Sequence, residues 1–482
     1  MKSPKTLNEL LHGYANADAR PIAAIATDSR AVTAETLWLA ARGVTHHALD
    51  YYRDGLQAAA IVYEPPYANP PAGAIACEQL GAHLGEIAAR FYDHPAKALN
   101  VIGVTGTDGK SSLVHFLAQA TGGAMLGTIG YGRLDALEAA SHTTPDPLRV
   151  QQYLARFRDA GIETVAMEVS SHALAQGRVA AVEYHIGVFT NLSRDHLDYH
   201  RDMEDYFRAK ASLFARPLPV AVINIDDAHG RRLLDENRVH PATRVIAVSS
   251  HDQTHPRAAQ TLRARNIVLS PDGIAYTLET EAEQVAIQSG LLARFNVDNL
   301  QNTAACLLAL GTPLAAIPAK LAALHGVPGR AERIGLGNGA AAIIDYAHTP
   351  AALANILQGV RAHVPGKLWC IYGCGGDRDR GKRPLMAQAA EQYADAVVIT
   401  DDNPRTENPA DIIADSLRGM GHREKAWIKR PREEAIRFVL PQLQAGDAVV
   451  IAGKGHEDYQ ILGTTKHHYS DQETVRTWLQ NR

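Results

Sequence analysis

Short apolar runs alternate with longer amphipathic segments along the whole chain. The first part contains three apolar runs that predict strands, at 22–26, 36–40 and 60–63. The segment 77–92 has the periodicity of an amphipathic helix, and the Pro-containing segment 93–98 predicts a hinge. We therefore expect a small N-terminal α/β domain over residues 1–97.

The next block predicts a mostly parallel sheet covered by helices on both faces. An apolar strand ends near Val104, and further strands are predicted at 164–169 and 186–190 with a helix at 148–160 between them. The turn sequence at 271–273 predicts a β-hairpin near the end of this block. We expect it to form a central P-loop-type domain over residues 98–333.

The last block again alternates strands and helices. Strands are predicted at 342–345, 368–372, 396–400 and 448–452, and helices near 350–363, 384–394, 409–420 and 431–444. This order is typical of a doubly wound, dinucleotide-fold-like domain, here 334–482. The fold class is therefore α/β with three domains.

Composition limits the possible functions. The chain has 482 residues, of which 46% are hydrophobic and 21% charged, and its net charge is −4. That balance argues against a nucleic-acid partner. The N-terminus lacks a signal-peptide core and no apolar run reaches membrane-spanning length, so we expect a cytoplasmic protein without a membrane partner. The cysteines lack the spacing of a zinc site and are expected to be thiols: Cys77, Cys306, Cys370 and Cys374.

A candidate phosphate loop follows the strand that ends near Val104. Gly106 and Gly109 bracket the loop, and Lys110 opens a segment with helical spacing. Free N–H groups at a helix start attract anions, Lys110 supplies a charge for outer phosphates, and the Ser111 hydroxyl suits Mg²⁺. The longer P-loop pattern fails because it requires glycine where Val104 stands, whereas the shorter G-T-x-G-K-[ST] form fits. The alternative is an ordinary glycine-rich turn.

Three further positions could take part in phosphate chemistry. Glu168 ends a buried strand and could hold Mg²⁺, or it could be a salt-bridged or helix-capping carboxylate. Lys210 could be a solvated surface charge, or a buried amine that takes up CO₂ as a carbamate. His196 could bind a second metal ion or only hydrogen-bond in the core. It belongs to a run that resembles a metal cluster: Asp195, His196, Asp198 and His200.

Three polar loops directly follow successive strands of the last block, at 373–383, 401–405 and 453–457. Arginine binds carboxylates through its planar fork, so Arg378 and Arg405 could clamp a carboxylated substrate. Glu457 could receive an ammonium group. Because the three loops share one edge of the sheet, a substrate site is favoured over unrelated surface charges.

Several short runs occur in a characteristic order: Thr27–Arg30, Gly106–Lys110, His142–Asp146, Met167–His172, Thr190–His200, Phe295–Asn299, Gly329–Glu332, Asp345–Pro350, Asp402–Arg405 and Gly453–Glu457. In these runs, and over its whole length, the chain resembles the Mur ligases, most closely those that add diaminopimelate. The resemblance implies an ATP- and Mg²⁺-dependent ligase of cytoplasmic peptidoglycan precursor synthesis, and we expect a monomer. Its substrates would be UDP-N-acetylmuramoyl-L-alanyl-D-glutamate and meso-diaminopimelate, joined through an acyl phosphate.

The resemblance also implies roles for individual positions. Catalysis would involve Lys110, Glu168, His196 and Lys210, and metal binding Ser111, Glu168, His196 and Lys210 as its carbamate. ATP would be held by Gly106, Thr107, Asp108, Gly109, Lys110, Ser111, Ser112, Asn299, Arg330, Asp345 and His348. The UDP substrate would contact Ser29, Thr143, Thr144, Ser170, Gln176 and Arg178. The amino acid would contact Arg378, Asp402, Asn403, Pro404, Arg405, Gly453 and Glu457.

The run Asp402–Arg405 favours diaminopimelate over lysine as the amino acid. The two differ by a distal carboxylate, which an arginine can recognise, and lysine-adding members carry another residue at the position of Arg405. We expect Asn403 and Arg405 to recognise the distal end. A lysine-adding ligase of the same family remains the alternative.

Two departures from the family pattern affect these assignments. Asp108 replaces an asparagine, which places a carboxylate near the ATP phosphates, and Ser111 replaces a threonine but keeps the hydroxyl. The run 43–47 is offset from the family pattern, so neither His46 nor His47 is assigned. The sequence is also compatible with a folylpolyglutamate synthetase-like ligase or a non-catalytic nucleotide-binding homologue. The first domain argues against the former, and the retained Lys110 and Lys210 against the latter.

Overall fold

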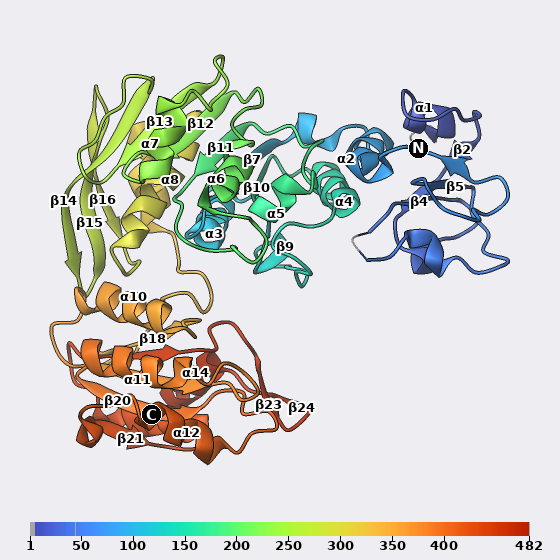
Figure 1. Cartoon of the computed structure of the whole chain (residues 1–482). Coiled ribbons are helices and arrows are strands. Elements are labelled where there is room, and N and C mark those ends of the chain that lie inside the picture. The colour runs from blue at the N-terminus through green and yellow to red at the C-terminus, as the bar shows by residue number, and fades with distance from the viewer. Residues whose placement is uncertain (1–4, 44, 482) are drawn as a thin grey trace. The chain divides into compact units, whose positions relative to one another are not determined.

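The computed structural model describes residues 5–43 and 45–481, which form two compact units. The first unit consists of Met1–Val248, Gln253–Thr261 and Ala305–Leu310, and the second of Ser249–Asp252, Leu262–Ala304 and Gly311–Arg482. Figure 1 follows the chain through its elements. The three-domain division after residues 97 and 333 stays a prediction.

The N-terminal part of the first unit contains a small parallel sheet of order β3-β4-β5-β6. The strands are β3 (Ala24–Ala26), β4 (Thr36–Ala40), β5 (Ala60–Tyr63) and β6 (Ile75–Ala76). The predictions for β4 and β5 are confirmed. All of β4 is buried, because apolar side chains on both faces pack against other elements.

The prediction of one strand over 22–26 is wrong. The N–H groups of Ala23 and Ala24 both donate to the carbonyl of Glu35, so the run divides there. Its first part is β2 (Pro21–Ile22), which pairs antiparallel with β1 (Lys5–Thr6).

The helix predicted over 77–92 is shorter at its start. α2 spans Leu80–Phe91, because Gln79 has a left-handed backbone (φ 52°) that no α-helix continues through. A five-residue helix, α1 (Leu7–Leu11), precedes it in the chain and buries three leucines.

The larger sheet of the first unit follows the order β13-β12-β11-β7-β10-β8-β9. The strands are β7 (Asn100–Thr105), β8 (Ala124–Gly127), β9 (Gly130–Arg133), β10 (Thr164–Glu168), β11 (Ile186–Phe189), β12 (Val220–Asn224) and β13 (Arg244–Ser249). All neighbours pair in parallel except β8 and β9, which form a hairpin. The predicted strands β7, β10 and β11 are confirmed and lie side by side in the middle.

Helices connect these parallel strands. They are α3 (Lys110–Thr121), α4 (Pro147–Asp159), α5 (Ser171–Ala175), α6 (Met203–Ala211) and α7 (Ala228–Asp235). The predicted start of α3 at Lys110 and the predicted α4 are confirmed. The carboxyl ends of β7, β10 and β11 lead directly into the polar segments singled out above.

The second unit begins with an antiparallel array in which β15 pairs with both β14 and β16. The strands are β14 (Gln260–Ser270), β15 (Gly273–Glu279) and β16 (Gln284–Ser289), and α8 (Phe295–Ala309) and α9 (Ile317–Ala322) follow. The turn between Ser270 and Gly273 confirms the predicted hairpin.

The C-terminal sheet of the second unit has the order β17-β18-β22-β19-β20-β21, in which only β17 is antiparallel to its neighbour. The strands are β17 (Glu332–Gly335), β18 (Ala341–Asp345), β19 (Leu368–Cys374), β20 (Ala396–Asp401), β21 (Ala426–Ile428) and β22 (Ala448–Ala452). The four predicted strands, β18, β19, β20 and β22, are confirmed.

Two hydrophobic layers cover the faces of this sheet. Alternate residues of β22 belong to different layers, Val450 to one and Val449 to the other. The first layer includes residues of α10 (Pro350–Arg361), α11 (Lys382–Tyr393) and α12 (Pro409–Leu417), and the second those of α13 (Arg432–Val439) and α14 (Asp471–Gln480). Figure 1 shows α10, α11, α12 and α14 beside the strands of this sheet. The doubly wound prediction is confirmed.

The helix predicted over 431–444 is wrong in its second half. α13 ends at Val439, and a 3-10 helix continues over Leu440–Gln442. Pro441 cannot donate the hydrogen bond that an α-helix would need there. A small hairpin, β23 (Tyr459–Leu462) and β24 (Thr465–His468), was not predicted.

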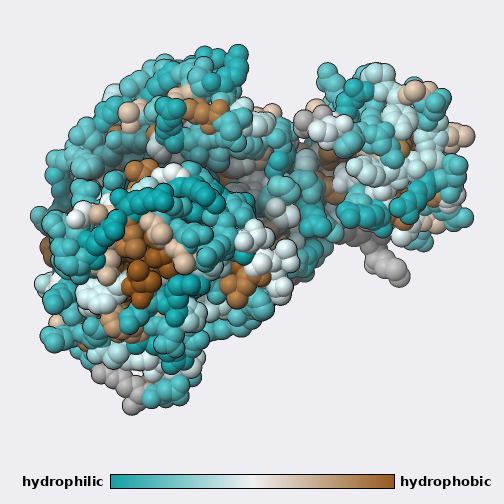
Figure 2. All heavy atoms as spheres, turned by 60° about the horizontal axis from the view of Figure 1, so that its bottom comes forward, coloured by the Kyte–Doolittle hydropathy of each residue, from teal (hydrophilic) through white to brown (hydrophobic). Residues whose placement is uncertain are grey.

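The surface is mainly hydrophilic on the face shown in Figure 2, with hydrophobic residues gathered in small patches. Among the described residues, no helix combines the length and hydropathy needed to cross a bilayer. The four cysteines are buried free thiols, as predicted.

Among the described residues, the buried cations are Lys210, Arg383, Arg432 and Lys454. Arg432 and Asp471 form an ion pair whose side chains are both 0% exposed, with N–O distances of 2.8 Å. The guanidinium also donates to the carbonyls of Ala452 (2.9 Å) and Asp401 (3.4 Å), the last residues of β22 and β20. Arg432 therefore links the carboxyl ends of two strands.

We expect Asp471→Ala to destabilise the second unit by about 3–5 kcal/mol, because it leaves the Arg432 guanidinium buried without a counter-ion. Urea unfolding followed by tryptophan fluorescence tests this, since Trp369, Trp427 and Trp478 lie in the second unit. The control is Glu433→Ala. It breaks an exposed pair with Arg437 and should cost less than about 0.5 kcal/mol. Similar shifts in the two variants would contradict the assigned role of Asp471.

Candidate functional site

The phosphate-loop sequence forms a tight connection between β7 and α3. Gly106 has φ 151°, and a Cβ atom there would collide with the Thr190 hydroxyl, so only glycine fits. Gly109 has φ 84° and stands immediately before Lys110, the first residue of α3. The first N–H groups of α3 therefore follow the loop directly, which is the predicted arrangement for binding phosphate.

Asp108 is held through its backbone rather than its side chain. Its N–H donates to Asn191 Oδ1 (2.9 Å), and its carbonyl accepts from Thr190 Oγ1 (2.7 Å) and Asn191 Nδ2 (3.2 Å). The carboxylate is exposed and accepts only a long bond from Ser193 Oγ (3.4 Å). Replacing the family's asparagine by aspartate therefore leaves the shape of the loop intact.

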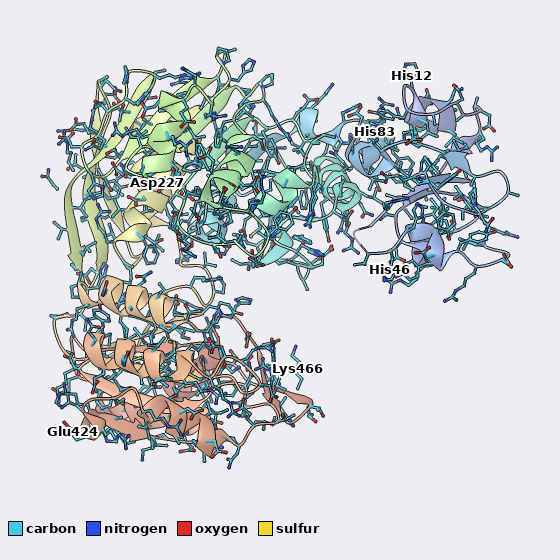
Figure 3. The ribbon with its side chains drawn as sticks, in the orientation of Figure 1. His12, His46, His83, Asp227, Glu424 and Lys466 are labelled. Atoms are coloured by element: carbon cyan, nitrogen blue, oxygen red, sulfur yellow. The ribbon has the colours of Figure 1, made fainter. Side chains whose placement is uncertain are left out.

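The segment that supports the loop is itself anchored by α7. Asp227, labelled in Figure 3, accepts from the N–H of Leu192 (3.1 Å) and also caps α7. Thr107 completes the link, since its N–H donates to Asn191 O and its hydroxyl accepts from the Ser193 N–H. The two loops at the ends of β7 and β11 thus form one hydrogen-bonded structure.

Two lysine ammonium groups converge on the carbonyl of Gly106. Lys110 Nζ lies 2.9 Å from this oxygen and 2.7 Å from the Thr107 carbonyl, and Lys210 Nζ on α6 lies 2.7 Å from the Gly106 oxygen. Lys210 is only 1% exposed, so the solvated alternative is wrong. Burial first, and the charge of Lys110 next, lower the pKa of Lys210 well below its ordinary value. A neutral buried amine is the condition for carbamate formation.

Glu168 is the last residue of β10. It pairs with Val104 of β7, the strand that leads into the phosphate loop. The side chain is 1% exposed and accepts from the N–H of Thr128 (2.8 Å) and from its hydroxyl (3.4 Å). It therefore caps no helix. With the hydroxyl of Ser111 in the first turn of α3, this buried carboxylate is of the oxygen-rich type that Mg²⁺ prefers.

The predicted metal cluster of Asp195, His196, Asp198 and His200 is wrong. Over 5–43 and 45–481, no three or more His, Cys, Asp or Glu side chains are placed to hold a metal ion. Asp195 accepts from the backbone N–H of His196, which has φ 54°, and the buried His200 faces Asp205 at 3.5 Å. His196 as one ligand beside Ser111, Glu168 and Lys210 stays a prediction.

The residues predicted to hold the diphosphate and peptide are connected by hydrogen bonds. Thr144 Oγ1 donates to the Glu168 carbonyl (2.7 Å) and accepts from the Ser170 N–H (3.1 Å). Arg178 donates to the Thr144 carbonyl (3.1 Å) and to Gln176 Oε1 (2.6 Å). Thr143 joins through the Thr128 hydroxyl (3.0 Å). The structure therefore brings these predicted residues together beside Glu168.

Ser29 lines a cavity of about 860 Å³ in the N-terminal part of the chain. Asp28 and Arg30 line it too and pair with each other at 2.6 Å, which lowers the pKa of Asp28 to about 2. The cavity also includes His46, labelled in Figure 3, which the sequence left unassigned, and the exposed aromatic Tyr51.

The ATP residues predicted outside the loop lie in the second unit. Asp345, at the end of β18, accepts from the N–H groups of Ala331 (2.7 Å) and Ala347 (2.8 Å). Burial raises the pKa of Asp345, although these bonds oppose the shift. Arg330 lies over the ring of Tyr346 at 5.1 Å.

The remaining two ATP residues make mainly local contacts. His348 is exposed and bonds to the Tyr346 carbonyl through Nδ1 (2.9 Å). Asn299, on α8, is buried and donates to Asn296 Oδ1 (2.9 Å). Neither contact tests an ATP-binding role, which stays a prediction for both.

The predicted amino-acid loops follow β19, β20 and β22. Arg378 and Arg405 both lie beside Gly375, where a Cβ atom would be 3.0 Å from Arg405 Nη1 and 3.7 Å from Arg378 Cγ. Arg405 has φ 51° and donates to the Gly376 carbonyl (2.8 Å). Asn403 Nδ2 donates to Glu457 Oε2 (3.3 Å). Two guanidinium groups and a carboxylate–amide pair are therefore available at this edge of the sheet.

Sequence reasoning missed the buried cations of this region. Lys454, beside the predicted Gly453, is 0% exposed and contacts both Asn403 and Glu457. Arg383 donates to Glu407 (2.8 Å) and to the Gly375 carbonyl (3.3 Å). The signal was present in part, since both residues belong to the loops already singled out, 373–383 and 453–457.

Comparison with known proteins decides the family. The chain is 45% identical over 95% of its length, and 95% of the relative's, to the UDP-N-acetylmuramoyl-L-alanyl-D-glutamate–2,6-diaminopimelate ligase of Alkalilimnicola ehrlichii. The chain belongs to the Mur ligase family. The Pseudomonas aeruginosa protein of the same name is 45% identical over 99% of this Mur ligase and 98% of its own length.

Family models and solved structures agree with this assignment. Residues 104–309 match the Mur ligase middle domain, and 329–455 the Mur ligase glutamate ligase domain. A solved UDP-N-acetylmuramoyl-L-alanyl-D-glutamate–2,6-diaminopimelate ligase is 34% identical, with a TM-score of 0.77 over 99% of each chain. A MurF from Acinetobacter baumannii, 18% identical over 99% of each chain with a TM-score of 0.66, shares the fold.

We expect Gly106→Ala to destabilise the phosphate loop of this Mur ligase by about 2–4 kcal/mol, because the Cβ atom clashes and φ is unsuited to alanine. Hydrogen exchange should show faster exchange at Thr107, whose N–H donates to Asn191 O. Gly122→Ala is the matched control, with φ 64° but nothing within 4 Å, and should cost no more than about 1 kcal/mol. Unchanged exchange at Thr107 would contradict the tight fit.

Proposed function

We propose that this Mur ligase joins meso-diaminopimelate to UDP-N-acetylmuramoyl-L-alanyl-D-glutamate with conversion of ATP to ADP and phosphate. The observation that carries the proposal is the 43–45% identity, over 95–99% of this chain, to relatives that bear this activity in their names. Because the substrates include intracellular nucleotides, we propose a cytoplasmic location. We retain the three-domain division and the monomer as parts of the proposal.

The phosphate loop would bind and orient the triphosphate. Lys110 and the first N–H groups of α3 favour negative charge on the transferred phosphoryl group, which is the main requirement of phosphoryl-transfer catalysis. The D-glutamate carboxylate of the substrate would attack the γ-phosphorus, and ADP would leave. The chemistry that bound Mg²⁺ would supply, held by Ser111, Glu168, His196 and carbamylated Lys210, is neutralisation of charge on the phosphate oxygens.

The product of that step is an acyl phosphate, from which an amine can displace inorganic phosphate. The amine of diaminopimelate attacks the acyl carbon, the new C–N bond forms, and the C–O bond to phosphate breaks. The network of Thr144, Ser170 and Arg178 would hold the diphosphate and peptide stem. Its members are linked by short hydrogen bonds, which limits the freedom lost on binding.

Specificity for diaminopimelate would come from the second unit. Arg405 and Arg378, beside Gly375, offer planar forks to the distal carboxylate, and Asn403 offers amide N–H groups. Lysine has no such carboxylate, so the arginine charges would stay unpaired in a lysine complex. This argues against a lysine-adding ligase.

A folylpolyglutamate synthetase-like activity and a non-catalytic role have less support. A folylpolyglutamate synthase of Mycobacterium tuberculosis, 17% identical over 77% of this chain, shares only the fold. A non-catalytic role would require that Asp108 disrupts the phosphate loop, but the hydrogen bonds at this position come from backbone groups and keep the loop formed.

Phosphate release tests the proposal, measured with ATP, Mg²⁺, UDP-N-acetylmuramoyl-L-alanyl-D-glutamate and a panel of amino acids. We expect turnover with meso-diaminopimelate and little with lysine. Turnover with lysine would keep the ligase and refute the specificity. No release with any amino acid would refute the proposed function.

We expect Lys210→Ala to lower kcat by at least about 100-fold, because it removes the side chain that would carry the carbamate beside the transferred phosphate. Short carboxylic acids added to the assay should restore part of the rate by replacing the carbamate. The control, Lys97→Ala, removes an exposed lysine and should leave kcat unchanged. A fully active Lys210→Ala enzyme would refute the carbamate.

We expect Arg405→Ala to raise KM for diaminopimelate by about 10–100-fold while KM for ATP changes less than about twofold, because a charge-assisted bidentate contact is lost. Steady-state kinetics in each substrate measures both values. Arg418→Ala, which removes an exposed arginine of the same unit, serves as the control. Equal changes in both KM values would eliminate the carboxylate clamp.

A further inference from the structure

Lys454 is a fully buried ammonium group at the centre of the loops that follow β20 and β22. Its Nζ donates to the Tyr459 carbonyl at 2.6 Å and to Asn403 Oδ1 at 3.3 Å, and lies 3.5 Å from the carboxylates of both Asp402 and Glu457. An ammonium so enclosed has no solvent to replace these partners. The side chains around it are therefore held in one arrangement.

The arrangement fixes the orientation of the Asn403 amide. Its oxygen accepts from Lys454 and from the Ile461 N–H (2.9 Å), and both of these groups can only donate. The amide nitrogen must therefore point the other way, where it donates to Glu457 Oε2 (3.3 Å). Asn403 consequently presents N–H groups, rather than an oxygen, to a ligand beside Glu457.

The arrangement also determines the net charge of the side chains around Lys454. Within this group of three side chains, Asp402 and Glu457 carry two negative charges and Lys454 one positive charge, so the group has one net negative charge. Asp402 Oδ1 is buried, lies 3.5 Å from Lys454 Nζ and is among the described atoms that have no hydrogen-bond partner. Because Lys454 stays beyond close hydrogen-bond distance, this carboxylate can still accept a closer bond from a ligand ammonium. One ammonium group of an amino acid would balance the remaining charge.

We propose that Lys454 is a positioning residue for the amino-acid substrate. It orients the Asn403 amide, and it offsets one of the two negative charges of Asp402 and Glu457, so that one ammonium group of the substrate balances the other. The proposal rests on the proposed function and deepens it. Lys454 acts through these side chains, and the hairpin of β23 and β24 supplies the Tyr459 carbonyl that accepts from Lys454 and the Ile461 N–H that donates to Asn403. Lys466 in Figure 3 belongs to the same hairpin and covers the Tyr459 ring.

The first test is Lys454→Met in the full-length enzyme, which removes the charge at nearly constant length. We expect KM for diaminopimelate to rise about 10–100-fold, because two carboxylates then repel each other and the amide is free to turn. KM for ATP and for the UDP substrate should change less than about twofold. Lys429→Met is the matched control, since Lys429 lies over Phe438 (4.3 Å) and should give wild-type values. A rise in all three KM values would overturn the proposal.

A double-mutant cycle separates positioning from a general loss of structure. With Glu457→Gln already in place, adding Lys454→Met should raise KM for diaminopimelate by a smaller factor than it does in the wild-type enzyme, since one of the two carboxylate charges on which Lys454 acts is gone. Additive effects would overturn the proposal. If Lys454→Met does not fold alone, the double variant compared with Glu457→Gln still measures the effect of Lys454 on each KM, and a rise in the KM values for all three substrates would overturn the proposal.

The same experiment separates this proposal from the proposed function. If the wild-type enzyme uses lysine instead of diaminopimelate, the proposed function fails, and the cycle is measured with lysine. A coupled effect there would keep Lys454 as the positioning residue, and additive effects would reject it.

Discussion

The structure depends on buried cations that hold together the loops at the carboxyl ends of parallel strands. Lys210, Arg383, Arg432 and Lys454 are each at most 1% exposed. The first three donate to a carbonyl at such a strand end or in the loop beside it, and Lys454 in the loop after β22 donates to the carbonyl of Tyr459, the first residue of β23. Strand ends leave carbonyl groups that the sheet cannot pair, and a long cationic side chain satisfies several at once. The loops gain their shape from these charges, because they have little apolar surface to bury.

The buried cations of the two units have different electrostatic surroundings. Lys210 shares the Gly106 carbonyl with a second lysine, and burial lowers its pKa well below the ordinary value. Lys454 stands between two carboxylates, and Arg432 is paired with Asp471. Burial beside a second cation lowers the pKa of a lysine, whereas close ion pairs with carboxylates make a buried cation a fixed part of the framework.

The sequence predicted elements well where burial decides them. The bounds of β4, β5 and β22 were correct because these apolar runs are buried, and α3 began where the glycine loop required. Prediction from the sequence failed where single backbone hydrogen bonds determine the end of a strand, as at Ala23 and Ala24, whose N–H groups both donate to the Glu35 carbonyl. It also failed where the strand is exposed, because β24 (Thr465–His468) has no apolar alternation. The buried cations were missed because a lysine or arginine is usually on the surface, and only tertiary contacts show otherwise.

The difference between backbone and side-chain hydrogen bonds explains why Asp108 is compatible with an intact phosphate loop. Every strong hydrogen bond at this position uses the backbone, and the partners Thr190 and Asn191 come from the strand end of β11. The side chain at 108 is therefore released from building the loop and can only alter the charge beside it. Since the carboxylate is exposed, water and salt screen much of that charge. Under the proposed function, the substitution would therefore alter the strength of phosphate binding, while the shape of the loop depends on Gly106, Gly109 and the two lysines.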